Sequence, residues 1–415
     1  MSAIRNYILV TGAYWAFTLT DGALRMLVLL HFHELGYRPI ELAGLFLFYE
    51  FFGVVTNLIG GWIATRLGLR FTLFSGLGLQ VGALAMLASL SPAWPATVSV
   101  PYVMAAQALS GIAKDLTKMS SKSSIKLIVP PDASASLFTW VAVLTGSKNA
   151  LKGAGFFLGG LLLSTIGFLQ ALWGMASVLL AVLAGCVLSL PSELGRSKQK
   201  AKFKGLLSKT REVNVLSAAR FFLFGARDVW FVVGVPVFLA SLGWGFTEVG
   251  SFLAIWVIGY GVVQSLAPAF IRRWTGGEAP QGRSAQVLAL LLACAMGLVA
   301  GGLTAGYPPT VVVLAGLGMF GVVFAVNSSV HSYLILAYSD GDKVAMNVGF
   351  YYMANAAGRL VGTVLSGALY QIGGLIVCLW ASTGFALAAG LVSLRLPRRE
   401  KALTMSEMKV EGGSD

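Results

Sequence analysis

Apolar stretches of about 20 residues recur from one end of this chain to the other, separated by short polar turns. A helix of that length spans a hydrocarbon layer about 30 Å thick. Only 11% of the 415 residues are charged and 57% are hydrophobic, whereas about 25% of the residues in a typical soluble domain are charged. We therefore predict an all-α integral membrane protein.

Twelve such stretches account for nearly the whole chain and leave no room for a sizeable soluble domain. The N-terminal residues carry one basic side chain and run directly into the first apolar stretch, so we expect no cleaved signal sequence. The predicted membrane-spanning helices cover residues 7–32, 40–64, 71–91, 97–117, 137–165, 168–190, 214–241, 248–271, 286–306, 310–335, 344–370 and 374–394.

Basic residues gather in alternate loops of the chain. The loops after odd-numbered spans hold little charge, whereas the even loops and the C-terminal tail are basic, and residues 191–212 hold seven lysines and arginines against two glutamates. By the positive-inside rule, the basic loops and both termini are expected to face the cytoplasm. The net charge of +13 is therefore first a topology signal, and nucleic-acid binding is not needed to explain it.

An internal repeat relates the two halves of the chain. Moving the sequence by 207 residues lays LGYRPIELAG, from Leu35, over LGWGFTEVGS, from Leu242. The same shift aligns Asp21 with Asp228, Arg66 with Arg273, Lys152 with Arg359, Gly155 with Gly362 and Gly160 with Gly367. Two parallel repeats of six spans are typical of the major facilitator fold, in which two bundles rock about a site near the bilayer midplane.

The repeat predicts how the chain divides. We expect one six-helix bundle over residues 1–190, a basic cytoplasmic linker over 191–212, a second bundle over 213–395 and a cytoplasmic tail over 396–415. A monomer is the default for such a fold. The chain has no phosphate-binding G-x-x-x-x-G-K-[ST] motif, and no clustered nucleophile, base or metal site, so we expect neither nucleotide hydrolysis nor another enzymatic activity, and no cofactor.

Two short motifs fit this fold. GGWIATRLGLR, from Gly60 to Arg70, resembles the facilitator loop motif G-x-L-A-D-R-x-G-R-K, with Thr65 in place of the usual aspartate. A basic loop that anchors the topology explains it equally well. GAGFFLGG, from Gly153 to Gly160, resembles a glycine-rich antiporter motif, but we interpret its glycines as sites where two helices approach closely.

Ionisable side chains inside the predicted spans indicate function, because an uncompensated charge costs about 2.5–3.5 kcal/mol at the centre of a membrane helix. The clearest pattern is a lysine at every fourth position, which forms a slowly turning stripe on one helix face. These lysines are Lys114, Lys118, Lys122 and Lys126, and Lys148 and Lys152 repeat the spacing in the next span. We place Lys122 and Lys126 at the cytoplasmic end, as a funnel or a topology signal.

Basic groups outnumber acidic ones about two to one within the spans. Asp21–Arg25 and Arg227–Asp228 are candidate pairs, but the surplus needs water or an anionic ligand. The predicted substrate-binding set is Lys114, Lys118, Lys148, Lys152, Arg220, Arg227, Arg359, Arg25, Asn149, Asn355 and Tyr351. The predicted proton-coupling or charge-pairing set is Asp21, Glu50, Asp115, Asp228 and His331.

Other candidate metal ligands and thiols are less informative. His31 and His33 lie near Glu34 at the outer end of the first span, and we interpret them as an interfacial polar cluster rather than a metal site. Cys186, Cys294 and Cys378 stand singly in predicted spans, so we expect neither a disulfide framework nor a thiolate cluster.

Long strings of the chain closely resemble the ArsJ-type organoarsenical exporters. They are YWAFTLTDGALRMLVLLHFHELGY, LFLFYEFFGVVTNLIGGW, QALSGIAKDLTKMSSKSSIKL, LTGSKNALKGAGFFLGG and SAARFFLFGARDVWFVV. The resemblance implies export of 1-arseno-3-phosphoglycerate across the bacterial inner membrane, which confers resistance to arsenate. Glyceraldehyde-3-phosphate dehydrogenase makes that ester from arsenate, so it is the implied functional partner.

Two other functions stay open from the sequence. A facilitator for organophosphates or sugar phosphates, exchanging with inorganic phosphate, needs the same cations, because its substrates are also polyanions. A non-transporting membrane sensor is a more distant alternative. The driving force is a gradient of an ion or of the substrate itself, and Asp21, Glu50, Asp228 and His331 are the candidate carriers for proton antiport.

Overall fold

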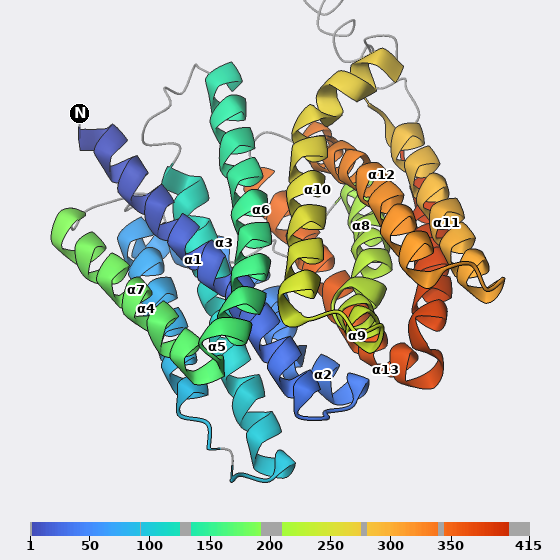
Figure 1. Cartoon of the computed structure of the whole chain (residues 1–415). Coiled ribbons are helices and arrows are strands. Elements are labelled where there is room, and N and C mark those ends of the chain that lie inside the picture. Colours follow the sequence, from blue (N-terminus) through green and yellow to red (C-terminus); the bar gives the residue numbers. More distant parts are fainter. Residues whose placement is uncertain are drawn as a thin grey trace, which may run out of the picture.

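Helices and short turns make up the described part of the chain, which contains no strand. The computed structural model describes residues 2–91, 93–124, 134–191, 210–274, 280–338 and 344–397. Figure 1 shows two groups of helices, with the first half of the chain in blue to green beside the second half in yellow to red. The predicted linker and tail fall largely outside the described residues, so the predicted domain boundaries stay predictions.

The first half contains seven helices in the described residues. They are α1 (Ser2–Glu34), α2 (Pro39–Leu45), α3 (Leu47–Leu67), α4 (Leu69–Ala88), α5 (Ala96–Ser124), α6 (Ser134–Thr165) and α7 (Phe168–Ser189). The described residues of the second half contain six more. They are α8 (Arg211–Phe231), α9 (Gly234–Ser241), α10 (Phe246–Trp274), α11 (Gly282–Thr304), α12 (Pro309–Ala337) and α13 (Val344–Ser393).

The twelve predicted spans all correspond to these helices. Among the described residues, nine stretches are long and apolar enough to cross a membrane. One of them contains the last two predicted spans, because α13 bends at the non-helical residues Gly373 and Gly374. The remaining two spans are α1 and α6, which are also long, and which carry Arg25 and the pair Lys148 and Lys152.

Two predicted spans are each interrupted by a break. The span predicted over 40–64 divides into α2 and α3 at Phe46, and the span over 214–241 divides into α8 and α9 at Val232 and Val233. Local signals explain where these spans begin. Pro39 occupies the first turn of α2, and the Thr210 hydroxyl accepts a hydrogen bond from the backbone N–H of Val213 at the start of α8.

The internal repeat is visible in the backbone as well as in the sequence. Gly36 and Gly243, which are 207 residues apart, both have positive φ angles, of 83° and 89°. Gly167 and Gly374 are another such pair, at 81° and 65°. Glycine takes this conformation at low cost, so the repeat aligns equivalent turns as well as equivalent helices.

Close helix crossings repeat in the same way. A Cβ on Gly155 of α6 would lie 2.5 Å from the Leu19 carbonyl oxygen of α1 and 3.0 Å from Gly22. Its equivalent in the second half is Gly362 of α13, where a Cβ would lie 2.9 Å from the Asp228 side chain of α8. Each half therefore brings its first predicted span directly against its fifth, which is α1 against α6 and α8 against α13.

The glycine-rich segment of α6 joins the two halves. Gly155 and Gly159 face α1, whereas Gly153 and Gly160 face α10, where a Cβ on Gly160 would lie 2.4 Å from the Phe246 carbonyl oxygen. The packing interpretation of this segment is thus confirmed. The other main contact between the halves is that of α3 with α13.

The loop that resembles the facilitator motif forms a tight turn between α3 and α4. Gly68 has a φ of 86°, and Arg70 donates a hydrogen bond to the Val187 carbonyl oxygen near the end of α7, at 3.3 Å. The side chains of Thr65 and Arg66 lie outside the described residues. The described part of the motif therefore links the start of α4 to the end of α7 by a hydrogen bond.

Candidate functional site

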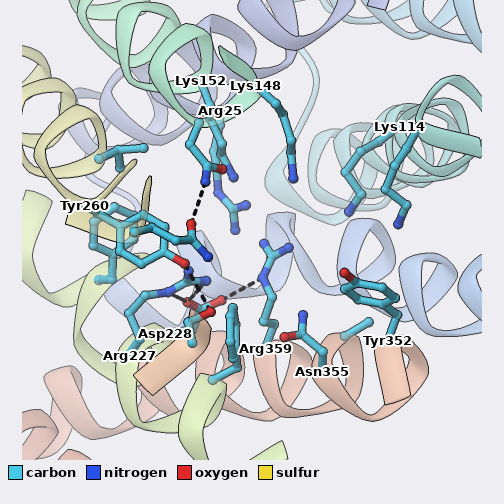
Figure 2. A pocket seen from close by; sticks show the side chains of 18 of the residues that line it. Arg25, Lys114, Lys148, Lys152, Arg227, Asp228, Tyr260, Tyr352, Asn355 and Arg359 are labelled. Carbon is cyan, nitrogen blue, oxygen red and sulfur yellow. Dashed lines mark hydrogen bonds and ion pairs between the residues drawn. The ribbon is translucent and has the colours of Figure 1, made fainter. Parts of the chain in front are cut away.

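A cavity of about 200 Å³ lies between the two halves, and side chains of both halves line it. Figure 2 shows basic side chains pointing into it from α1, α5, α6, α8 and α13. The spacing of four residues on each helix explains part of this arrangement, because Lys148 and Lys152 share one face of α6 and Asn355 and Arg359 share one face of α13.

Eight basic side chains of the described chain line this cavity. They are Arg25, Lys114, Lys118, Lys148, Lys152, Arg220, Arg227 and Arg359. All eight belong to the predicted substrate-binding set, and the predicted residues Asn149 and Asn355 line the cavity with them. Side chains that are far apart in the sequence are thus brought together around one space.

Tyr351 is the member of the predicted set that does not line the cavity. It is fully buried beneath Arg220, whose guanidinium carbon lies 5.1 Å from the centre of the Tyr351 ring. The next residue, Tyr352, lines the cavity instead. Adjacent residues of a helix point in directions about 100° apart. The four-residue spacing from Tyr351 to Asn355 therefore identified the correct helix, but Tyr352 is the tyrosine that reaches the cavity.

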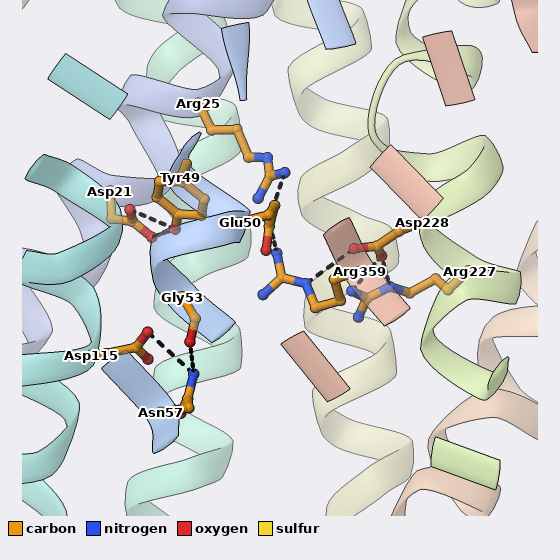
Figure 3. Close-up of polar contacts among 10 residues, drawn as sticks. All are labelled: Asp21, Arg25, Tyr49, Glu50, Gly53, Asn57, Asp115, Arg227, Asp228 and Arg359. Carbon is orange, nitrogen blue, oxygen red and sulfur yellow. Dashed lines mark hydrogen bonds and ion pairs between the residues drawn. The ribbon is translucent and has the colours of Figure 1, made fainter. Parts of the chain in front are cut away.

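A chain of ion pairs crosses from one half to the other. Glu50 of α3 accepts hydrogen bonds from Arg25 at 3.1 Å and from Arg359 at 2.5 Å. Arg359 also donates to Asp228 at 3.0 Å, and Asp228 pairs with its neighbour Arg227 at 2.5 Å. Figure 3 shows this line of alternating charges. The predicted Arg227–Asp228 pair is confirmed.

The predicted Asp21–Arg25 pair is wrong. Arg25 turns to Glu50, while both carboxylate oxygens of Asp21 accept from the Tyr49 hydroxyl, at 2.9 and 3.0 Å (Figure 3). Residues four apart on a helix share a face, but a carboxylate from another helix can approach an arginine more directly. Here α3 supplies both competing groups, because Tyr49 and Glu50 are adjacent in it.

A second pair closes the side of the cavity near α5. Lys118 donates hydrogen bonds to the Asp115 carboxylate and to the Asn57 side-chain oxygen, the latter at 2.6 Å. The Asn57 amide donates in turn to Asp115, at 3.2 Å. Asp115 is fully buried, so this pair compensates a charge inside the first half.

Three of the eight cations have no carboxylate partner among the described residues: Lys114, Lys152 and Arg220. Each lies against an aromatic ring instead. Lys114 Nζ is 4.0 Å from the centre of the Tyr49 ring, and Lys152 Nζ is 5.6 Å from that of Phe156. Such cation–π contacts stabilise a partly desolvated charge but do not neutralise it.

Arg220 is the uncompensated cation of the second half. Its Nε donates to the Asn355 side-chain oxygen at 2.8 Å, and its Nη1 donates to the Ser328 hydroxyl at 3.1 Å. Its guanidinium carbon lies 4.1 Å from the centre of the Phe224 ring. Neutral partners therefore fix the orientation of this guanidinium while its full charge remains.

The balance of charge around the cavity is strongly positive. Eight basic groups in the described chain face four carboxylates, counting Asp21 and Glu50, which stand just behind the lining. The excess agrees with the two-to-one ratio read from the sequence. Arginine and lysine at close quarters are suited to phosphate-like oxyanions and carboxylates, and several of them suit a ligand with more than one anionic group.

Other predicted residues lie away from the cavity. His331 is fully buried in α12 and is not among the lining residues, and neither of its ring nitrogens has a hydrogen-bond partner in the described chain. His31 stacks on Phe168 with ring centres 4.1 Å apart. The side chain of Lys122 and the whole of Lys126 lie outside the described residues.

The sequence-based set missed several neutral polar residues of the site. Asn149 of α6 donates to Gln264 of α10 at 3.0 Å, and the Tyr260 hydroxyl donates to Ser328 at 3.3 Å. The internal repeat could have identified Gln264, because it is the equivalent, 207 residues later, of Asn57, and both side chains line the cavity. For Tyr260 and Ser328, polar residues in apolar spans, the sequence offered no comparable signal.

Comparison with known proteins places this cavity in context. The family model described as Major Facilitator Superfamily matches residues 9–334. A search of curated protein sequences returns no match. Among solved structures, the chain is similar to that described as "Crystal structure of a POT family transporter in complex with 5-aminolevulinic acid".

That similarity concerns the fold. The two chains share 14% sequence identity with a TM-score of 0.72, and the match covers 94% of this chain and 95% of the other. It agrees with twelve spans in two repeated halves around a central cavity. With most of its length matched by the family model, this chain belongs to the major facilitator superfamily.

Proposed function

We propose that this membrane transporter carries a multiply charged organic anion, and that its substrate is the organoarsenical 1-arseno-3-phosphoglycerate, exported to confer arsenate resistance. The observation that carries the proposal is the set of three cavity cations without a carboxylate partner in the described chain, Lys114, Lys152 and Arg220. Close resemblance of the sequence to the ArsJ-type exporters supports the particular substrate.

The positions of these cations suit a ligand that has an anionic group at each end. Lys114 and Lys152 belong to the first half and Arg220 to the second. An arsenate group and a phosphate group on a three-carbon chain can engage both halves at once. A ligand shifts a conformational equilibrium only by its difference in affinity between states, and contact with both halves favours the state in which they close around it.

The membrane potential is a sufficient driving force for such a substrate. Each negative charge that leaves a cell with a negative interior gains about 2.3 kcal/mol per 100 mV. Export of a polyanion is therefore downhill electrically, without a counter-ion. Proton antiport through Asp21, Glu50, Asp228 or His331 stays a prediction of the sequence. We place the protein in the bacterial inner membrane as a monomer with both termini in the cytoplasm.

The experiment uses everted membrane vesicles, in which export appears as uptake. The vesicles receive arsenate, glyceraldehyde 3-phosphate, NAD and glyceraldehyde-3-phosphate dehydrogenase, and trapped arsenic is measured. We expect uptake that needs all four components, because only together do they generate the ester. Uptake of arsenic from arsenate alone would contradict the proposed substrate.

The same vesicles test the alternative functions. Uptake of stable organophosphates, or of phosphate in exchange for phosphate, together with no arsenic uptake from the complete mixture, would assign the cavity to an ordinary organophosphate facilitator. Binding of anions without movement of any of them would indicate a sensor. The dehydrogenase acts here as the source of the substrate, so the assay does not depend on physical contact between the two proteins.

A further inference from the structure

The internal repeat aligns two pairs of an aspartate with a basic residue, and only one of the two forms an ion pair in the described structure. Asp21 and Lys152 of the first half correspond to Asp228 and Arg359 of the second, 207 residues later. In the second half the pair is closed, with Arg359 Nε 3.0 Å from Asp228 Oδ2. In the first half Asp21 is bonded to the Tyr49 hydroxyl, and Lys152 lies over the Phe156 ring.

The backbone nevertheless brings Asp21 and Lys152 side by side. A Cβ on Gly22, the residue after Asp21, would lie 2.8 Å from the Lys152 carbonyl oxygen and 3.2 Å from Gly155. A change of rotamer turns the Asp21 carboxylate away from Tyr49, and the adjoining backbone of α6 is the part of that helix that carries Lys152.

Asp21 is also the carboxylate of the site that is available for such a change. The other three each have a basic partner: Glu50 holds Arg25 and Arg359, Asp115 holds Lys118, and Asp228 holds Arg227 and Arg359. Within the described chain, Asp21 has only a phenol. It retains 6% of its surface exposed, whereas the other three are fully buried.

Other ionisable groups around Asp21 come from the helices packed on this part of α1. They are Tyr49 and Glu50 from α3, Lys114 and Asp115 from α5, Lys152 from α6 and, on α1 itself, Tyr14 and Arg25. Among the cations, Arg25 is already paired with Glu50, and Lys114 lies over the face of the Tyr49 ring, with Nζ 4.0 Å from the ring centre. Lys152 is the cation whose backbone adjoins that of Gly22, the residue after Asp21.

An uncompensated cation is a barrier to the return step of a transporter. When the halves close over a bound anion, its negative groups compensate Lys152. When they close without the anion, the bare ammonium is desolvated at membrane depth, which is costly. A carrier with no internal replacement can return only with another anion bound, so it exchanges anions and performs no net export.

We propose that Asp21 is this internal replacement: in the absence of substrate it leaves Tyr49 and pairs with Lys152, so that the carrier returns empty and export is net transport rather than exchange. This inference rests on the proposed function, since it takes an anion as the substrate. No covalent bond changes; a hydrogen bond from Tyr49 is replaced by an ion pair with Lys152, which reproduces the Asp228–Arg359 pair.

The experiment compares two fluxes in one preparation of proteoliposomes. Radiolabelled 3-phosphoglycerate, the stable phosphate-bearing product of ester hydrolysis, is loaded inside, and its exit is measured with and without the same unlabelled anion outside. The first flux is exchange and the second is net efflux. Their ratio does not depend on how much protein is inserted. Potassium and valinomycin hold the potential constant.

We expect the wild type to show net efflux and exchange at similar rates. In Asp21→Asn we expect the ratio of net efflux to exchange to fall by about tenfold or more. A tenfold fall corresponds to an increase of about 1.4 kcal/mol in the activation barrier of the empty return step. The matched control is Glu248→Gln, which removes an exposed carboxylate at the start of α10 and is expected to keep the wild-type ratio. An Asp21→Asn ratio equal to that of the wild type overturns the inference but leaves the proposed function intact. Absence of 3-phosphoglycerate flux in the wild type also overturns the inference, whereas the proposed function is overturned by the arsenic-uptake assay.

A second variant keeps Asp21 and weakens its contact with Tyr49. Tyr49→Phe deletes the hydroxyl that holds Asp21 away from Lys152, so Asp21 competes more strongly with the substrate. We expect the KM for 3-phosphoglycerate to rise several-fold while the ratio of net efflux to exchange stays at the wild-type value. An unchanged KM overturns the inference, even where Asp21→Asn fails to fold.

Discussion

Lys114, Lys152 and Arg220 each hold a positive charge against an aromatic ring and form no ion pair with a carboxylate of the described chain. Such a side chain costs stability in the absence of a ligand and contributes affinity in its presence. Sites of this kind show a trade-off between stability and activity. Substitution by glutamine keeps most of the volume and the hydrogen-bonding capacity and removes the charge.

We expect Lys114→Gln, Lys152→Gln and Arg220→Gln each to weaken anion affinity by about 10- to 150-fold, because a hydrogen bond to a charged group contributes about 1.5–3 kcal/mol. The same variants are expected to unfold at equal or higher temperature than the wild type in detergent. Equilibrium binding and thermal unfolding measure the two effects. Arg38→Gln, which removes an exposed cation paired with Glu41, is the control. Loss of binding together with a lower unfolding temperature would mean that these cations are structural.

Glu50 is expected to behave in the opposite way. It compensates Arg25 and Arg359 and has no exposed surface, so Glu50→Gln leaves two arginines facing each other. Breaking a buried ion pair on one side costs about 3–5 kcal/mol. We expect a marked fall in unfolding temperature, partly recovered in the double variant Glu50→Gln/Arg359→Gln. A variant Glu50→Gln as stable as the wild type would show that this pair contributes nothing to the contact between the halves.

At the residue scale, the sequence predicted which side chains gather but not how they pair. Ten of the eleven residues in the predicted set line the cavity, because charged groups in apolar helices must face an interior space. The pairing of Arg25 depended on α3, which approaches from another part of the chain. Spacing along one helix cannot show which partner from a second helix lies nearer.

Helix α6 is the element on which both packing and binding depend. Its glycines fit against α1 on one side and α10 on the other, and its lysines face the cavity. A side chain added at a glycine contact therefore displaces the cations as well as the helix. Close contacts of small residues replace the hydrophobic effect as the source of helix association in a membrane.

We expect Gly155→Ala to destabilise the protein by about 1–3 kcal/mol, since the added Cβ would lie 2.5 Å from the Leu19 carbonyl oxygen. Gly12→Ala in α1 is the control, because a Cβ there meets nothing within 4 Å and alanine favours a helix by about 1 kcal/mol. Thermal unfolding and the yield of monodisperse protein after size-exclusion chromatography are the measurements. Equal stability of the two variants would contradict the packing of α1 on α6.

At the element scale, the sequence predicted every span to within a few residues but neither of the interruptions. The break at Phe46 falls inside a continuous apolar stretch with no proline or glycine at the break itself. The break at Val232 and Val233 comes just before Pro236, which has no N–H to bond to the Val232 carbonyl oxygen. Hydropathy indicates whether a segment prefers lipid to water, and it does not report a change in the direction of the helix axis. Pro236 is thus a local signal for the second break that the hydropathy pattern did not use, whereas the break at Phe46 has no such signal.

The whole molecule works, on the proposed function, by movement of one half against the other. The C-terminal end of α6 meets the N-terminal end of α10 where the Ser164 and Thr247 hydroxyls lie 3.0 Å apart. We expect a disulfide in the variant Ser164→Cys/Thr247→Cys to stop anion flux and a reducing agent to restore it. The three native cysteines are replaced by alanine in the parent protein, and each single variant is the control. Full flux in the cross-linked protein would mean that the halves do not separate at this point.

At the scale of the whole chain, the repeat of 207 residues predicted two matching halves, and it extends to the turn glycines and the helix crossings. What it did not predict is where the halves differ. Asp228 is paired with two arginines, while its equivalent Asp21 is bonded to a tyrosine that has no polar counterpart in the second half, where Trp256 stands at that position. A sequence repeat aligns the two aspartates and their basic partners, but it cannot show in which half the ion pair forms.

The central claim is that uncompensated cations on both halves hold a polyanionic substrate between them. Its most direct test is arsenic uptake into everted vesicles, supplied with the four-component mixture, by the double variant Lys152→Gln/Arg220→Gln beside Arg38→Gln and the wild type. We expect uptake by the double variant to fall to the level of vesicles without the transporter, with normal insertion and with normal uptake by Arg38→Gln. Uptake by the double variant at the wild-type rate would contradict the claim.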